Sequence, residues 1–499
     1  MPRFATLVAY LLFSCASSAE PVVIHQAGTF TVLQDDLGSI GGINTDEQVR
    51  VPFADQAPHV GMRRLGDLAP RFLRHAPSPA PTATMRLERS VLHVHLPPGE
   101  TAATFGVSVT FRQGLLTRFH PAADVWVNGQ LQPPGGSDYP LFPPWPTDKT
   151  VSSLIWSTVI AGGVRDVGAL TSTVPAEQAP LLIDAALLTV GEQRQHALSY
   201  RGLGHLDAPL RAQHLYPREY GLWVTISESA AKDMTMTTVP ELWLVDVRDD
   251  GTAAVHRMNE TAADSASGVM FLDDQFAEAE YSTTALQKLW QELNAALIKD
   301  GLFADEALDV LHARNTAHLT SPGRRLLFLA PQAWTAAHLP LTISRAARIV
   351  RSMIGCIELV TDAQQAALAR IAAGPVSQPG WYYELIRREL IDGPDGKPTW
   401  QPGSAERIKA LFAGEAGVLQ RLQVEVPEDY AAYLSLGRFR DALVSEHLRR
   451  TGDRELALFR ETYLVNQVSA MVQAAADGNG RVKLKPPDQG ADTLAPVSK

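Results

Sequence analysis

The sequence predicts a multidomain protein with an all-β N-terminal region, one or two antiparallel β-sandwiches, followed by a mainly α region with a few strands. Three observations predict this fold class. Residues 22 to about 270 contain many short runs rich in β-branched residues, separated by turn signals. Beyond residue 275 or so, apolar residues recur at helical spacing. The chain has 499 residues, 45% of them hydrophobic. A chain of this length usually folds around more than one hydrophobic core.

The predicted order is a signal peptide, a β-rich domain, a Pro/Gly-rich linker, a second β-rich domain, a mainly helical α+β domain and a disordered tail. The linker is placed at its run of prolines, which cannot serve a sheet ladder, and the tail at its polar, Pro/Gly-bearing composition. In that order, the segments span residues 1–19, 20–132, 133–150, 151–272, 273–477 and 478–499.

The N-terminal residues have the features of an export signal. Arg3 supplies positive charge, residues 4–13 are apolar but too few to cross a bilayer, and the small residues 17–19 precede a cut before Glu20. A buried N-terminal strand is the competing interpretation. We expect export to the periplasm or the cell exterior.

Cys15 leaves a second form of export open. The sequence "LFSC" resembles a lipoprotein signal, in which the cysteine is lipidated, although Phe13 replaces the usual small residue. A lipid anchor in the outer membrane is therefore an alternative to simple cleavage. After cleavage only Cys356 remains, so no internal disulfide forms. Because Cys356 lies in an apolar run, it is predicted to be a buried, inert thiol.

The β-rich part shows both strand periodicity and hairpin signals. The sequence "MRLERSVLHVHLP" alternates apolar and polar residues with a period of two. Asn128-Gly129 and Asp250-Gly251 each join two strand-like runs, and both dipeptides favour tight hairpin turns.

The second part begins with a helix over 282–301, capped by Ser282 or Thr283 and ended by Gly301. Further elements follow along the chain. Thr361 and Gln364 stand in capping-box positions at the start of one more helix. The other predicted elements are a helix over 304–319, strands over 324–331 and 347–360, and helices over 404–477.

Composition excludes several classes of partner. The formal net charge is -10 and Lys and Arg do not cluster strongly, which argues against nucleic acid. No segment after the leader reaches about 18 uninterrupted apolar residues, so no transmembrane helix is expected in the mature chain. Nucleotide-binding, metalloprotease and nucleophile-elbow motifs are missing, and no cofactor is predicted.

His93 and His95 form an H-x-H on a predicted strand. The two-residue period places both imidazoles on one face, where they can share a metal ion. A third ligand must come from elsewhere in the chain. The competing interpretation is a pair of ordinary polar residues on a solvated face. The candidates for the third ligand are His205, His214 and Asp207.

The stretch "YRGLGHLD" has three interpretations. In the first, His205 is a general base oriented by Asp207. In the second, Arg201 and Asp207 form an ion pair across a turn made by Gly202 and Gly204. In the third, the glycines allow close backbone approach at a bulge.

Four stretches taken together resemble a family of exported bacterial proteins without an assigned activity. The resemblance implies export and a shared architecture over most of the mature chain, and it carries over no site residue. The stretches are "VSVTFRQGLLTRFHP", "YRGLGHLDAPL", "PLTISRAARIVRSMIGCIELVT" and "LGRFRDALV".

The function predicted from the sequence is non-catalytic: an extracytoplasmic binding or scaffolding component of the cell envelope, with an envelope protein or glycan as partner. The sequence predicts no oligomeric state. The alternative is a hydrolase acting on envelope carbohydrate or peptide, with its site between the β and helical regions. In that hypothesis His205 and Asp207 would be catalytic, and Arg201 would hold an anion.

The export prediction is tested by the mass of the mature protein. Expressed in a bacterial host, the protein is expected outside the cytosol with a mass that begins at Glu20. A lipid-modified product that begins at Cys15 would show that the protein is anchored by lipidation and not simply cleaved before Glu20. Full-length protein confined to the cytosol would contradict export.

Overall fold

The computed structural model is mostly strand, in several sheets whose strands pair mainly antiparallel, with fewer helices, as predicted for a β-rich chain. The leader, most of the predicted linker and the predicted tail lie outside the residues that the structure describes. Those residues are 20–43, 82–132, 146–162, 183–214, 221–233, 238–258, 261–262, 269–312, 319–374, 388–392, 398–404, 407 and 416–464.

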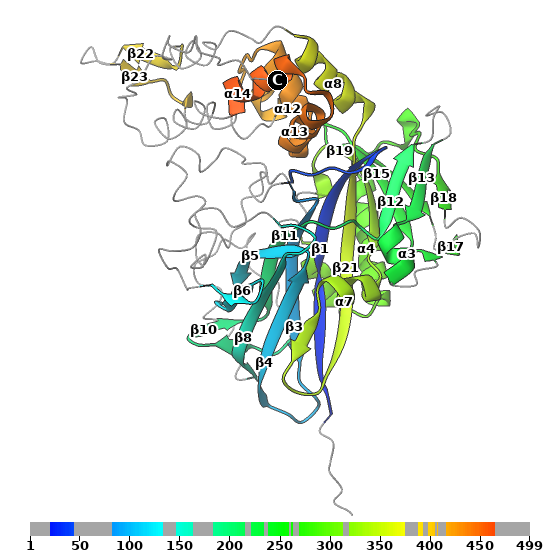
Figure 1. Cartoon of the computed structure of the whole chain (residues 1–499), viewed down its shortest axis with the longest axis vertical. Coiled ribbons are helices and arrows are strands. Elements are labelled where there is room, and N and C mark those ends of the chain that lie inside the picture. The colour runs from blue at the N-terminus through cyan, green and yellow to red at the C-terminus, as the bar shows by residue number, and fades with distance from the viewer. Residues whose placement is uncertain are drawn as a thin grey trace, which may run out of the picture.

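A nine-stranded central sheet organises the molecule. Its strand order is β16-β15-β19-β21-β1-β3-β11-β5, and β2 lies off this path, paired with the last residues of β1. The long strands β1 (Val22–Asp35) and β21 (Ala347–Leu359) run parallel, side by side (Figure 1). On its other side β1 pairs antiparallel with β3 (Met85–His95). The remaining strands are β2 (Gly38–Ser39), β5 (Gly114–His120), β11 (Leu198–Gly204), β15 (Leu242–Val247), β16 (Ala253–Met258) and β19 (Gly323–Leu329).

The position of β1 explains its composition. Nearly every residue of β1 is buried, because both faces of the central sheet are covered. A strand covered on both faces reads as a near-continuous run of β-branched and apolar residues, as "VVIHQAGTFTVL" does. The polar residues within this run, including His25 and Thr31, are therefore buried as well.

A second sheet packs against one face of the central sheet. Buried side chains of both sheets share one hydrophobic cluster that includes Phe30, Leu87, Phe111 and Trp156. On β4 buried positions alternate with more exposed ones, as expected for a strand with one covered face. The strands are β4 (Ala102–Arg112), β6 (Asp124–Val127), β7 (Gln130–Leu131), β8 (Val151–Gly162), β9 (Leu188–Val190), β10 (Gln193–Gln195) and β20 (Leu341–Ile343).

Both predicted hairpins are confirmed. β6 pairs with β7 across Asn128 and Gly129, which have φ values of 49° and 80°. β15 pairs with β16 around Gly251, whose φ is 83°. Asn and Gly adopt positive φ more readily than other residues, so these dipeptides suit the turns they form.

The predicted domain boundaries do not separate the sheets. β19 and β21 belong to the segment predicted as the helical domain, 273–477, yet they lie inside the central sheet between β15 and β1. Strands from 20–132 and 151–272 also join this sheet. The reason is the pairing of Val22 with Ala347, a contact between distant parts of the chain that leaves no local signal.

Helices α4 (Ala285–Lys299) and α5 (Ala304–Val310) cover the other face of the central sheet. Leu289, Leu293 and Leu297 of α4 are buried against residues of β1, β3, β15 and β21. The predicted cap of this helix was wrong. The N-cap is Thr284, which makes no side-chain capping bond, because its backbone is already helical. Gly301 does follow the helix, with φ 116°. The predicted second helix, 304–319, ends early, at Val310.

The later helices pack as a group at one end of the central sheet (Figure 1). Their hydrophobic cluster includes Leu33 and Val360 from the ends of β1 and β21. The predicted capping box is confirmed: Gln364 N–H donates to Thr361 Oγ1, and Thr361 N–H donates to Gln364 Oε1. The helices are α8 (Asp362–Ala373), α11 (Ala416–Arg421), α12 (Glu428–Ser435), η6 (Gly437–Phe439), α13 (Arg440–Thr451) and α14 (Arg454–Leu464).

Smaller elements complete the described part of the chain. A three-stranded sheet contains β12, β13 and β18 in that order. Among the described residues no helix is long and apolar enough to span a bilayer. The bounds are β12 (Leu210–His214), β13 (Leu222–Ile226), β14 (Thr238–Val239), β17 (Thr261–Ala262), β18 (Val269–Leu272), β22 (Leu390–Asp392), β23 (Pro398–Trp400), α3 (Glu228–Asp233), η5 (Glu278–Glu280) and α7 (Gln332–His338).

The packing of α4 gives a stability prediction. Leu293→Ala leaves a cavity between the helix and the sheet, and it is expected to lower the free energy of unfolding by about 2–5 kcal/mol. The control is Ile298→Ala on the same helix, where the side chain is 40% exposed, with an expected loss of about 1 kcal/mol or less. Urea unfolding of both variants measures the difference. Equal losses would contradict this account of the helix.

Candidate metal centre

Two neighbouring strands place three histidines together. His93 and His95 lie on the same face of β3, as their spacing predicts. In the antiparallel pairing of β1 with β3, His25 lies directly opposite His93. Directly opposed residues of such a pair have their Cβ atoms about 5 Å apart on one face, so the three imidazoles form one cluster.

Glu306 of α5 completes the cluster from the helical side. Its Oε2 lies 2.5 Å from His25 Nδ1, and its Oε1 lies 2.8 Å from His95 Nε2. His93 Nδ1 is 3.4 Å from the same Oε1. One carboxylate therefore faces three ring nitrogens.

The position of Glu306 is fixed by the start of its helix. Glu306 is the third residue of α5, and its Oε2 also accepts a hydrogen bond from Phe303 N–H at 2.9 Å. This is one half of a capping box, which holds the carboxylate near the helix start. The ring of Phe303 packs against His25 and His95, with centroid distances of 4.9 Å and 4.7 Å.

Two contacts hold α5 beside this cluster, one from β3 and one from the loop before β9. Arg89 of β3 donates to Asp309 at 2.9 Å. Asp305 accepts a hydrogen bond from Asp184 N–H at 2.6 Å. The cluster is therefore built on a sheet and a helix tied together on both sides, which limits how far its side chains can move.

The cluster is buried and electrostatically unusual. His25, His93 and Glu306 are at most 1% exposed, whereas the His95 side chain is 14% exposed. Burial by itself raises the pKa of Glu306, but the neighbouring imidazoles of His25, His93 and His95 outweigh it and hold this pKa far below its usual range. The carboxylate is thus charged in a place where an uncompensated charge is costly.

The residues present fit a metal ion. The ligand atoms of His25, His95 and Glu306 all lie within 4.8 Å of one another. Donors around a tetrahedral Zn²⁺ ion are separated by about 3.3 Å, so small shifts would bring them to bonding distance. His93 Nδ1 is buried and makes no hydrogen bond to any described residue. A cation at the centre would give this nitrogen a partner and balance the charge of Glu306.

The other residues predicted as third ligands lie elsewhere. His205 follows Gly204, which pairs with Met85 at the far end of β3 from His95. Ten residues of strand separate these ends, about 33 Å. His214 contacts Asp36 and Asp274 instead. The interpretation of His93 and His95 as residues on a solvated face is wrong for His93, which is buried.

The structure does not bring the predicted catalytic residues together. His205 Nδ1 contacts the carbonyl oxygen of Thr82, and Asp207 accepts a hydrogen bond from Ser39 Oγ at 2.9 Å. Asp207 therefore orients neither His205 nor Arg201, which lies within β11. This removes the geometry on which the general-base and ion-pair interpretations both depend.

The two glycines of this stretch have a packing role. The register of β11 shifts at Gly202 against both of its neighbouring strands. A Cβ on Gly202 would lie 2.7 Å from the carbonyl oxygen of Leu115, and one on Gly204 would lie 2.8 Å from the ring of Phe111. The structure therefore supports the third interpretation, a bulge with close backbone approach.

Sequence reasoning missed His25 and Glu306. His25 lies in an apolar strand run, where a lone polar residue gives no sign of its partner. Glu306 lies 281 residues away, and its helix starts after Phe303, which is not a usual capping residue. Cys356 is fully buried, as predicted, and burial raises the pKa of its thiol strongly.

The bulge interpretation predicts an asymmetry between two variants of the same stretch. Gly202→Ala is expected to lower the free energy of unfolding by about 1–3 kcal/mol, because the new Cβ overlaps backbone. Asp207→Asn, at an exposed position, is expected to change it by about 0.5 kcal/mol or less. Chemical denaturation compares them. A larger loss for Asp207→Asn would restore a role for the carboxylate.

Comparison with known proteins adds no activity to this geometry. No protein-family model and no curated protein matches the chain.

Proposed function

We propose that this chain is an exported, non-catalytic metal-binding protein of the cell envelope. The ion is a divalent transition metal, with Zn²⁺ as the first choice. The observation that supports this most is the convergence of three imidazoles on the buried carboxylate of Glu306. Imidazole nitrogen together with one carboxylate oxygen is a donor set that suits Zn²⁺ and its neighbours among the transition metals.

Each ligand has a defined source in this proposal. His25 Nδ1, His93 Nδ1 and His95 Nε2 supply nitrogen, and the Glu306 carboxylate supplies oxygen. The Phe303 N–H keeps the carboxylate oriented towards the sheet. A polar group that orients a ligand in this way strengthens binding.

The number of protein donors favours binding over catalysis. Structural and storage sites fill the tetrahedron of Zn²⁺ with four protein ligands, whereas catalytic sites leave one position open for water. The donors of His25, His95 and Glu306 lie within 4.8 Å of one another, and this proposal takes His93 Nδ1, 3.4 Å from Glu306 Oε1, as the fourth. The hydrolase alternative requires one donor to leave the ion, and the His205 and Asp207 geometry gives it no support.

The cellular setting of the proposal follows from the sequence. The leader, whether cleaved before Glu20 or lipidated at Cys15, and the resemblance to exported bacterial proteins both favour an extracytoplasmic location. We infer further that the two larger sheets form a sandwich and that the later helices form a recognition module for an envelope protein or glycan. Their separate hydrophobic clusters support this division.

Metal titration of the full mature chain tests the proposal. After removal of bound metal with a chelator, calorimetry is expected to show one high-affinity Zn²⁺ site, and Co²⁺ is expected to give the absorption of a tetrahedral complex. Zn²⁺ at about 100 times its Kd should stabilise the protein by about 2.7 kcal/mol, seen as a higher Tm.

Variants distinguish the cluster from surface binding. His25→Gln and Glu306→Gln are each expected to weaken Zn²⁺ binding by about 100-fold or more, because each removes a ligand. His205→Gln is the matched control and should bind as the wild type does, because His205 lies at the other end of β3. The proposal fails if Zn²⁺ neither binds nor raises Tm, or if Glu306→Gln binds it equally well.

A further inference from the structure

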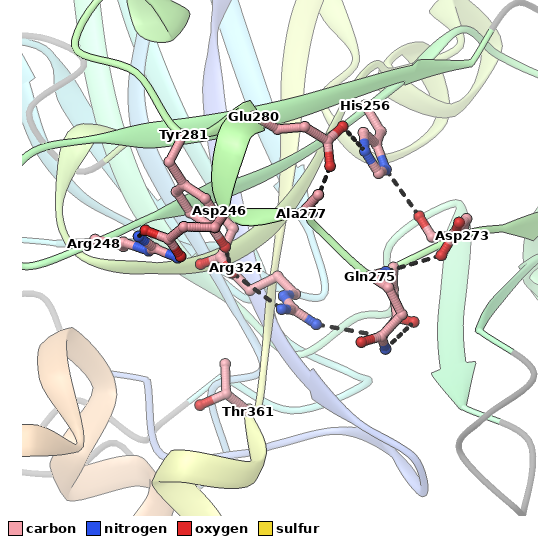
Figure 2. A network of polar contacts seen from close by, with 12 residues as sticks. Asp246, Arg248, His256, Asp273, Gln275, Ala277, Glu280, Tyr281, Arg324 and Thr361 are labelled. Carbon is pink, nitrogen blue, oxygen red and sulfur yellow. Dashed lines mark hydrogen bonds and ion pairs between the residues drawn. The ribbon is translucent and has the colours of Figure 1, made fainter.

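The segment from Asp273 to Tyr281 joins β18 to α4 and lies beside the edge of the central sheet made by β15, β16 and β19 (Figure 2). Its charged and aromatic side chains face those strands. Arg324 of β19 donates to Asp274 at 3.3 Å and to Asp246 of β15 at 3.0 Å. Tyr281 donates its hydroxyl hydrogen to the same Asp246 at 3.0 Å.

His214 holds the first end of this segment. Its Nε2 lies 3.0 Å from Asp274 Oδ2, and its Nδ1 lies 2.9 Å from Asp36 Oδ1 in the turn after β1. The imidazole and Asp274 are both largely buried, with side-chain exposures of 11% and 4%. One ring therefore bridges two carboxylates from different parts of the chain.

His256 of β16 holds the same segment further along. Its Nδ1 lies 3.0 Å from the backbone carbonyl oxygen of Asp273, and its Nε2 lies 2.8 Å from Glu280 Oε1 (Figure 2). Phe276 packs against the imidazole, with ring centroids 4.2 Å apart.

The partners of these two rings determine their protonation state. Carboxylates and carbonyl oxygens only accept hydrogen bonds, whereas a neutral imidazole has one donor and one acceptor nitrogen. His214 and His256 each face an acceptor at both nitrogens. All four contacts are therefore hydrogen bonds only when both rings are protonated imidazolium ions.

We propose that His214 and His256 form a pH-sensitive clamp on the segment 273–281, closed when both imidazoles are protonated and loosened when they lose a proton. This device is independent of the metal centre. It acts on a segment that leads directly into α4, the helix that packs on the central sheet.

The neighbouring charges favour the protonated state. Asp36 and Asp274 face His214, while Glu280 and the Asp273 carboxylate act on His256. Hydrogen bonding to Asp274 and then to Asp36 raises the pKa of His214 against the effect of burial. Burial lowers the pKa of His256, but Asp273 and Glu280 outweigh it and raise this pKa overall. The contacts in which no histidine takes part are those of Arg324 with Asp274 and Asp246, and of Arg248 with Glu278.

The sign of the pH effect follows from these shifts. Both histidines have pKa values above the ordinary 6.5 in the folded protein. Their contribution to holding the segment is therefore complete below pH 6.5 and is lost as the pH rises through the folded values. The arginine contacts remain, so the segment loosens locally while the sheet stays folded.

Hydrogen exchange of the full chain tests the clamp. Protection factors, corrected for the chemical exchange rate, are measured at about pH 5.5 and about pH 8.5 for peptides covering 273–281 and 347–359. The first peptide is expected to lose about tenfold in protection at the higher pH, and the second, in β21, is expected to stay unchanged. Equal protection of 273–281 at both values would overturn the proposal.

Variants assign the effect to the two histidines. In the double variant His214→Gln, His256→Gln the segment should exchange quickly at both pH values, so the pH dependence disappears. His447→Gln on α13 is the matched control and should keep the pH dependence of exchange in the segment 273–281. Persistence of the full pH dependence in the double variant would overturn the clamp.

A second measurement holds even if the double variant fails to fold. NMR titration of the wild-type histidine ring protons is expected to show two imidazoles with pKa values above 6.5. The single variants His214→Gln and His256→Gln should each lack one of these two resonances. Titration of both rings at or below 6.5 would overturn the proposal. Neither experiment involves a metal ion, so failure of the clamp leaves the metal centre untouched, and the reverse also holds.

Discussion

The placement of β1 between β21 and β3 is the constraint on which the rest of the structure depends. This pairing brings Val22 opposite Ala347 and so joins the beginning of the described chain to its second half. It also brings His25 opposite His93. Once β1 is covered on both faces, its polar side chains have no access to water and need partners from other elements. The cluster of His25, His93, His95 and Glu306 is one consequence of that requirement.

The charged residues of β3 show how the helices find their positions on this sheet. His95 meets Glu306 at one end of the strand. Six residues before it Arg89 meets Asp309, and the adjacent Glu88 meets Arg438 of η6. Buried ion pairs contribute little net stability, but leaving one partner buried alone is costly. These pairs therefore select the docking of α5 and of the later helices against alternatives that would separate the charges.

Local features of this fold were predictable, and long-range ones were not. The strand at 85–95, the hairpins at Asn128-Gly129 and Asp250-Gly251 and the capping box at Thr361 depend on neighbouring residues, and all four are present. The central sheet crosses the predicted domain boundaries, because β19 and β21 pair with strands from the first half of the chain. The face shared by His93 and His95 followed from their spacing. Their partners His25 and Glu306 could not be predicted from the sequence, because only tertiary contact brings these two residues to the histidines of β3.

If the cluster on β1, β3 and α5 is a closed metal site, its first coordination shell shows this most directly. X-ray absorption at the zinc edge of the Zn²⁺-loaded protein reports that shell. We expect about four light donors at about 2.0–2.1 Å, with the multiple-scattering signature of about three imidazoles. A shell of six oxygens, or one with no imidazole signature, would contradict it.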